Sequence, residues 1–409
     1  MHNSIKIRRI NILLFFILLF SIGEVCVLFF FNNPRYGKVI EVIGLCGIIS
    51  TFLTSKYHNN FNPKIKFIYN FYLIVAFTTI FRGLIFTPHT LFTEYCINGK
   101  ILTLLIPLIA LLNIDITYVK YILRWSLYSV IFAAFFLFAN FHDLFLNPTE
   151  IIQSNINEWD ARIIGRPQVP ATFTIPICAF LFLYKDSNRN SKWGVYLIIL
   201  LASLAALLSG RRSTLFTIVF LLIPYCFCYI KRHWKILLLT IFILTFTNIS
   251  TKNIDYFISE KFAVMYERID SDTRSGTEND FYKDMQLKDW IFGRGLTGTF
   301  KSPSVAAVDK LNRTDIETGY LTFILKGGLI LLIPYLIILI NSAYKGLSSN
   351  NIFCKYAGFY IFAHILYLYP SGFPELSLRF FILWFFVIIC QNKLTTSANN
   401  YDLKNKILL

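Results

Sequence analysis

Long apolar runs recur along most of this 409-residue chain and restrict what it can fold into. Many of them approach the roughly 20 residues that an α-helix needs to cross the hydrocarbon core of a bilayer. The chain is 56% hydrophobic and only 15% charged, whereas soluble domains carry about 25% charged residues. A transmembrane β-barrel would show short alternating segments instead. The pattern therefore predicts an all-α, polytopic transmembrane helical bundle.

We expect about twelve spans within a single integral-membrane domain, residues 1–409. The basic N-terminus precedes an apolar run too long for a signal peptide, so we interpret this run as a retained first span. Several runs are shorter than about 20 residues, so one helix could be re-entrant. The expected spans are about Ile10–Phe31, Val39–Thr54, Phe67–Phe86, Ile97–Leu112, Ile122–Asn140, Val169–Tyr184, Trp193–Leu208, Ser213–Ile230, Ile236–Asn248, Gly319–Ile340, Ile352–Tyr369 and Leu378–Cys390.

The distribution of lysine and arginine predicts the orientation of these spans. With the N-terminus in the cytoplasm, twelve spans return the C-terminus there, and every inside segment is basic. The positive-inside rule accounts for this bias and for much of the net charge of +16. We therefore expect both termini to be cytoplasmic, and we do not expect nucleic acid to be a partner.

Two outside segments are too long to be simple connectors. They are Phe141–Gln168 and the large polar loop Ile249–Asp315. Loops longer than about 12–15 residues are usually functional or disordered. Within the larger loop, Phe257–Ile269 and Asn279–Phe292 carry apolar residues at near-helical spacing, which predicts amphipathic helices on the membrane or over the bundle. Gly293 to Gly295 then predicts a tight turn where the loop re-enters the bundle.

Arg211 and Arg212 lie side by side in the run Trp193–Ile230, which carries no other charge. A charge at membrane depth costs roughly 2.5–3.5 kcal/mol on insertion scales, so it persists mainly where it faces a partner, a cavity or a ligand. The planar guanidinium fork suits a phosphate or carboxylate. An ordinary charged hairpin between two spans is the alternative.

The same topology brings further charges to the outer face. Each has a simpler interpretation alone: a solvated loop charge for the arginines, and for Glu317 an acid that complements a helix dipole. Their convergence on one face is what favours a functional site. The set comprises Arg162, Arg166, Arg274, Glu317 and Arg379.

No pattern in the chain indicates a metal or nucleotide site. The six histidines are scattered without paired spacing, and no phosphate-binding glycine loop is present. The eight cysteines nearly all fall in apolar runs, which favours buried small side chains. We therefore expect no metal and no cofactor.

Four segments, taken in order, resemble the bacterial O-antigen polymerase and O-antigen ligase superfamily. RIIGRPQVPATFTIP at 162–176 is similar to its Arg-x-x-Gly segment before a span, and LLSGRRSTLF at 207–216 to its Ser-Arg-Gly-type turn, with Gly and Arg swapped. Thr273-Arg274 through FGRGLTGTF at 292–300 resembles its arginine-containing loop, and ETGYLTFILKGG at 317–328 the segment with one polar site residue. Ligases carry His where this chain has Glu317, which favours the polymerase side.

The resemblance implies a metal-independent glycosyltransferase of the bacterial inner membrane, active at the periplasmic face. Its donor and acceptor would be oligosaccharides on undecaprenyl pyrophosphate, with a chain-length regulator protein as a further partner. Arginines would neutralise the pyrophosphate leaving group, and a carboxylate would orient or deprotonate the acceptor hydroxyl. The residues carried over are Arg211, Arg212 and Arg274 for the leaving group, Glu317 for the hydroxyl, Arg162 and Arg166 for steering the donor, Arg379 and Tyr320 for substrate binding, and Gly327 and Gly328 for close helix packing.

Three other functions stay open at this point. An O-antigen ligase would move the finished chain onto the lipid A core. A flippase or transporter of lipid-linked oligosaccharide would also use arginines in a cavity, although it should carry charges through the depth of the bundle and show two similar halves. A structural or sensor protein would use the basic outer loop as a docking surface.

Overall fold

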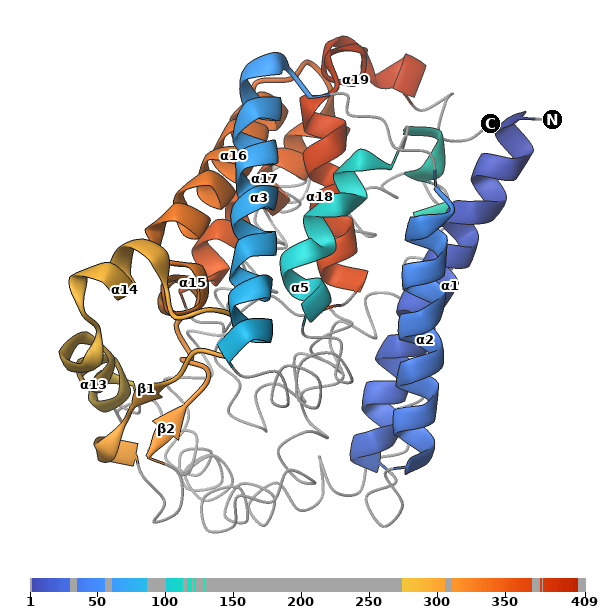
Figure 1. Cartoon of the computed structure of the whole chain (residues 1–409). Helices are drawn as coiled ribbons and strands as arrows, with labels where there is room; N and C mark the ends of the chain where they lie inside the picture. Colours follow the sequence, from blue (N-terminus) through green and yellow to red (C-terminus); the bar gives the residue numbers. More distant parts are fainter. Residues whose placement is uncertain are drawn as a thin grey trace, which may run out of the picture. The chain divides into compact units, whose positions relative to one another are not determined.

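The computed structural model describes the N-terminal quarter and the C-terminal third of the chain (Figure 1). Expected spans 6 to 9, the loop 141–168, nearly all of span 5 and the first part of the loop 249–315 lie outside the described residues. Except for Tyr128, the described residues belong to one compact unit, Met1–Trp125 with Thr273–Leu409. The described positions are 2–29, 35–55, 61–86, 101–112, 116–119, 121, 122, 125, 128, 274–305, 311–369, 376 and 378–403.

The described part is mostly helical, which confirms the prediction of a helical membrane protein at this level. Three of its helices are long and apolar enough to cross a membrane: α2 (Arg35–Leu53), α3 (Pro63–Phe86) and α16 (Leu329–Leu347). Shorter apolar stretches lie in α1 (His2–Phe29), in α17 (Ile352–Tyr367) and in α18 (Leu378–Gln391). These helices overlap the expected spans 1, 2, 3, 10, 11 and 12.

A layer of aromatic side chains joins α3 to the C-terminal helices. The Tyr335 ring on α16 lies 5.9 Å from Tyr72 on α3 and 6.1 Å from Trp384 on α18, measured between ring centroids. The buried Tyr335 hydroxyl also pairs with His364 Nε2 on α17 at 3.1 Å. Because this polar pair is satisfied inside the apolar layer, it fixes the helices in register without leaving an unpaired group.

Expected span 10 is two helices, so the prediction of one continuous helix from Gly319 to Ile340 was wrong. Helix α15 (Gly319–Gly327) ends at Gly328, whose φ is +70°, and α16 begins directly after it. A Cβ at position 328 would lie 2.1 Å from the carbonyl oxygen of Ile291. The expected close approach at this glycine is present, and the incoming backbone is what breaks the helix.

Expected span 4 also differs from a regular α-helix. The single-turn helix α5 (Ile101–Leu105) passes into a 3₁₀ segment, η2 (Ile106–Leu111). Pro107 lies at the start of η2 and has no backbone N–H to continue the α-helical ladder.

The described residues in the second half of the large loop form a small packed unit, which we call the loop module (residues 274–305 and 311–316). Its elements are α13 (Ser275–Asp284), α14 (Leu287–Phe292), β1 (Phe300–Lys301), η5 (Pro303–Val305) and β2 (Asn312–Arg313). β1 pairs antiparallel with β2, with Phe300 opposite Arg313. The fully buried Phe281 is the centre of this unit, with its ring edge-on to Trp290 at 5.7 Å and to Phe300 at 5.5 Å.

A single amphipathic helix over Asn279–Phe292 was predicted, and this prediction was wrong. The helix stops after Asp284, and a capping box formed by Gln286 and Asp289 starts α14. These side chains satisfy backbone groups at the new N-terminus, so the break costs little.

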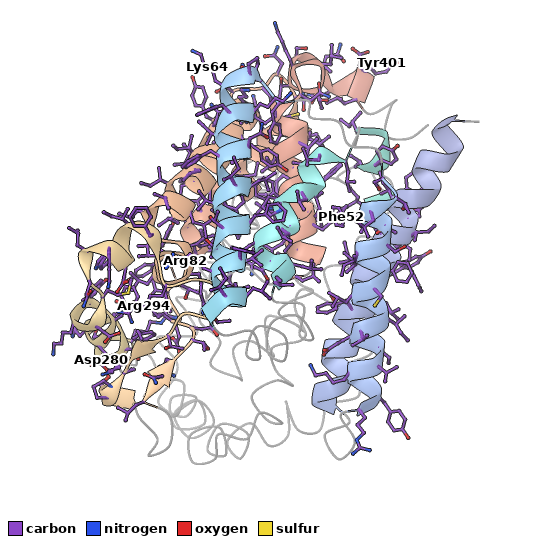
Figure 2. All side chains as sticks on the ribbon, viewed as in Figure 1. Phe52, Lys64, Arg82, Asp280, Arg294 and Tyr401 are labelled. Atoms are coloured by element: carbon purple, nitrogen blue, oxygen red, sulfur yellow. The ribbon has the colours of Figure 1, made fainter. Side chains whose placement is uncertain are left out.

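The predicted turn after α14 is present and docks the loop module onto the bundle (Figures 1 and 2). Gly293 and Gly295 have φ values of +66° and +88°, which favour glycine. The N–H of Arg294 donates to Leu325 O at 2.7 Å. Arg82, near the end of α3, donates to Phe292 O at 2.7 Å and to Gly293 O at 3.0 Å, and so satisfies carbonyls at the C-terminal end of α14.

Candidate functional site

Two residues predicted for the site form an ion pair across a long stretch of sequence. Arg274 Nε lies 2.9 Å from Glu317 Oε2. Arg274 is the N-cap of α13, whereas Glu317 immediately precedes Thr318, the N-cap of α15. The Glu317 side chain is 64% exposed and that of Arg274 is 35% exposed. Exposed ion pairs stabilise a fold by only about 0–1 kcal/mol. This pair therefore contributes little to folding, and both charges can interact with a ligand.

One face of α13 carries the residues around this pair. Arg274, Glu278 and Tyr282 are four residues apart, a spacing that places them along the same side of a helix. Glu278 Oε1 accepts a hydrogen bond from Thr318 Oγ1, one residue after Glu317. The face of α13 therefore meets the start of α15 at two successive positions.

The start of α15 is built to hold this arrangement. Because the Thr318 hydroxyl is committed to Glu278, it does not cap its own helix. Thr322 holds the segment before the helix: its hydroxyl accepts from Ile316 N at 3.1 Å and donates to Ile316 O at 2.8 Å. The segment that carries Glu317 is thereby fixed from both sides.

The other two described candidates lie where α15, α17 and α18 meet. Gly319 N donates to Leu368 O at 2.8 Å, which joins the start of α15 to the end of α17. The Tyr320 hydroxyl donates to Ile365 O, also on α17. The Arg379 guanidinium lies 3.9 Å from the ring centroid of Tyr367, a cation–π contact that holds it at the start of α18. Both side chains thus have structural contacts at the same end of the bundle as Glu317.

Sequence analysis missed Arg294, which clamps the loop module. Its guanidinium donates to both carboxylates nearby, to Asp284 Oδ2 at 2.5 Å and to Asp289 Oδ2 at 2.8 Å and 3.0 Å, and to the backbone oxygens of Asp284 and Thr299. Burial lowers the pKa of Arg294, but the hydrogen bonds and charges of Asp284 and Asp289 outweigh burial and raise this pKa overall. Arg294 therefore stays cationic at any working pH.

Lys326 was also missed, because it lies inside an apolar run. Its side chain is only 1% exposed at the end of α15. Its Nζ donates to Gly298 O at 3.1 Å and lies 4.0 Å from Asp315 Oδ1. The ammonium group thus ties α15 to the turn of the loop module.

The predicted residues Arg162, Arg166, Arg211 and Arg212 lie outside the described residues. Of the predicted set, the structure brings Arg274 and Glu317 into direct contact and places Tyr320 and Arg379 at the same end of the bundle. Glu278 and Thr318 were not predicted as part of this cluster. The four-residue spacing of Arg274, Glu278 and Tyr282 was the signal that could have found Glu278.

Within the described residues, no group of three or more His, Cys, Asp or Glu side chains is arranged to hold a metal ion. The arrangement offers instead a carboxylate that can accept a hydroxyl proton and cations that can bind an anion.

A search of family models, of curated proteins and of solved structures finds no match for the chain in any of the three.

Proposed function

We propose that the protein is a membrane glycosyltransferase that polymerises oligosaccharide repeat units carried on undecaprenyl pyrophosphate. In this proposal it is an O-antigen polymerase with about twelve spans in the bacterial inner membrane. The observation that carries the proposal is the Arg274–Glu317 pair, 2.9 Å apart and open to solvent, formed by two of the segments that resemble the family. A cation that can bind phosphate next to a carboxylate that can accept a hydroxyl proton suits a reaction between a hydroxyl and a phosphorylated sugar.

The lysines of the described helices support the proposed orientation. Because the end of α3 and the start of α16 both meet the turn of the loop module, these two helices run in opposite directions. The starts of α3 and α17 and the ends of α16 and α18 therefore share the bundle end opposite to Glu317. This end carries Lys64, Lys66, Lys345, Lys355 and Lys393. The positive-inside rule favours the cytoplasm for such an end, and in the proposal the Arg274–Glu317 pair is accordingly periplasmic.

The proposed reaction is a single displacement at the anomeric carbon of the donor. The acceptor hydroxyl forms the new glycosidic C–O bond, the bond to pyrophosphate breaks, and the hydroxyl proton passes to Glu317. Arg274 would bind the pyrophosphate as it leaves, together with Arg211 and Arg212. Pyrophosphate is a weak base, so its departure needs charge neutralisation more than a general acid. Arg162, Arg166 and Arg379 would attract the anionic donor, and no cofactor is required.

The test is a gel of surface polysaccharide from host cells that lack the protein and carry a plasmid copy. We expect the wild-type copy to restore a ladder of long chains. Glu317→Gln and Arg274→Glu should give a single repeat unit on the core with normal amounts of protein in the membrane. Arg313→Ala is the matched control, because Arg313 lies in the same loop module and donates to Thr277 rather than to Glu317.

Each competing function predicts a different gel. A ligase would leave long chains on the lipid carrier when the protein is absent, and a flippase would leave single units on the cytoplasmic leaflet. A full ladder from both Glu317→Gln and Arg274→Glu would refute the proposed site. An unchanged ladder in cells without the protein would refute the proposed function.

A further inference from the structure

We propose that Tyr282 and Tyr369 form a carbohydrate-binding subsite beside the Arg274–Glu317 pair, at which pyranose rings of the acceptor oligosaccharide stack on the exposed phenol rings. This inference rests on the proposed function for the identity of the glycan. The residues themselves are placed by contacts that are independent of that function.

Tyr282 extends the face of α13 that carries the ion pair. It follows Arg274 and Glu278 at the next four-residue interval, and it is 49% exposed. Its ring lies parallel to that of Trp290, with an angle of 2° between the planes and 6.0 Å between the centroids. Trp290 also meets the buried Phe281, so the stack is anchored in the core of the loop module. Tyr282 is therefore an exposed ring held in a fixed orientation.

Tyr369 approaches the pair from the bundle. It follows Leu368, whose carbonyl oxygen accepts from Gly319 N, two residues after Glu317. Tyr369 is 64% exposed. Partial burial raises the pKa of Tyr282, and the charges of Glu278 and Tyr369 raise this pKa further, which agrees with their proximity. Two exposed tyrosines from separate elements thus lie at the same end of the bundle as the two carboxylates.

This combination fits sugars better than it fits a lipid surface. A pyranose has an apolar C–H face that packs on an aromatic ring and an edge of hydroxyls that donate to carboxylates. Glu278 and Glu317 supply such carboxylates beside the rings. Packing these carboxylates against lipid acyl chains would instead cost desolvation free energy. The apolar residues suited to lipid, Leu287, Ile291 and Phe292, lie on α14.

The experiment measures binding without catalysis. The full-length protein in lipid nanodiscs is titrated with a soluble oligosaccharide of two repeat units, released from the surface polysaccharide of the host, and the Kd is read by saturation-transfer NMR. We expect Tyr282→Ala and Tyr369→Ala each to weaken binding about tenfold. Tyr282→Phe keeps the ring and should bind within about twofold of wild type. Tyr401→Ala is the matched control, because Tyr401 is 73% exposed and belongs to the opposite end of the bundle.

Two results would overturn the subsite: no binding of the oligosaccharide by the wild type, or unchanged binding by both alanine variants. Weaker lipid retention in these variants with unchanged glycan binding would identify the rings as a membrane anchor instead. Tyr369→Ala keeps the test decisive if Tyr282→Ala fails to fold. Polymerisation is measured on the same preparations with Glu317→Gln. No polymerisation by the wild-type preparation would refute the proposed function, and continued polymerisation by Glu317→Gln would refute the proposed site. Glycan binding that ignores both tyrosines would refute only the subsite.

Discussion

Replacing Arg294 with alanine should loosen the packing of α13 against α14 within the loop module. Its guanidinium joins the end of α13, the start of α14 and the strand-side residue Thr299. Alanine removes all five of these hydrogen bonds and leaves two carboxylates facing each other without a cation.

The size of the effect follows from the two carboxylate pairs. A hydrogen bond to a charged group contributes about 1.5–3 kcal/mol. The groups are partly open to water, so the lower value applies to each pair, and the module should lose about 3 kcal/mol of local stability. At about 1.4 kcal/mol per factor of ten, this loss corresponds to about 100-fold more frequent opening.

Hydrogen exchange measures this opening directly, because protected amides exchange in proportion to the population of the open state. Two amides are informative. The Gly295 amide donates to Lys326 O, and the Ser302 amide donates to Leu311 O. In Arg294→Ala, the amides of Gly295 and Ser302 should exchange about 100-fold faster than in wild type. Arg294→Lys keeps the charge but loses the planar guanidinium, so these amides should exchange about tenfold faster than in wild type.

Arg313→Ala is the control in the same module. Arg313 donates to the Thr277 hydroxyl at 3.2 Å, a single charge-assisted bond without a carboxylate partner that contributes about 1.5 kcal/mol, so exchange should rise by about tenfold at most. If Arg294→Ala and Arg313→Ala accelerated exchange equally, or if neither changed it, the clamp assigned to Arg294 would be refuted.

Two further predictions concern the backbone and pH. Gly328→Ala should strongly lower the apparent Tm in detergent, because a left-handed φ costs roughly 1–2 kcal/mol and the new Cβ would lie 2.1 Å from Ile291 O. Gly276→Ala is the control: its Cβ would lie 3.1 Å from the nearest atom, so stability should change by under about 1 kcal/mol. Equal Tm values for the two variants would contradict this explanation. Hydrogen bonds from the Ser304 side chain, and then from other groups, lower the pKa of Asp280, so its contribution to stability is complete above the ordinary aspartate pKa of about 3.9 and is lost as pH falls through the lower folded value. The Ser304 amide, which donates to Asp280, should therefore lose hydrogen-exchange protection below about pH 4, whereas an Asp280→Asn variant that shows the same pH dependence would contradict this assignment.

Hydrophobic run length was enough to predict much of the described fold. It placed α2, α3, α17 and α18 because a helix in apolar surroundings, whether lipid or protein, needs little beyond length and apolarity. It did not predict the break at Gly328, because the apolar run continues through this position. The cause of the break is the backbone of Ile291, which belongs to a distant segment that periodicity does not detect.

The loop module was predicted less well for a related reason. Apolar spacing suggested one helix over Asn279–Phe292, but local capping by Gln286 and Asp289 stops and restarts it. The role of Arg294 depends on acids on both sides of that break, a relation that is visible only once α13 and α14 have been placed. The expected convergence of Arg274 and Glu317 rested on topology and resemblance, and the structure places their side chains in contact. The arginines 162, 166, 211 and 212 stay predictions.

The most direct test of the proposed function is polymerisation by the purified protein in liposomes. The substrate is the lipid-linked repeat unit of the host, and both long glycan and released undecaprenyl pyrophosphate are measured over time. The account predicts that wild type makes polymer and releases one carrier for each bond formed, and that Glu317→Gln does neither although it is folded and inserted. Polymer formation by Glu317→Gln at the wild-type rate, or a wild-type protein that binds the substrate without forming any glycosidic bond, would contradict it.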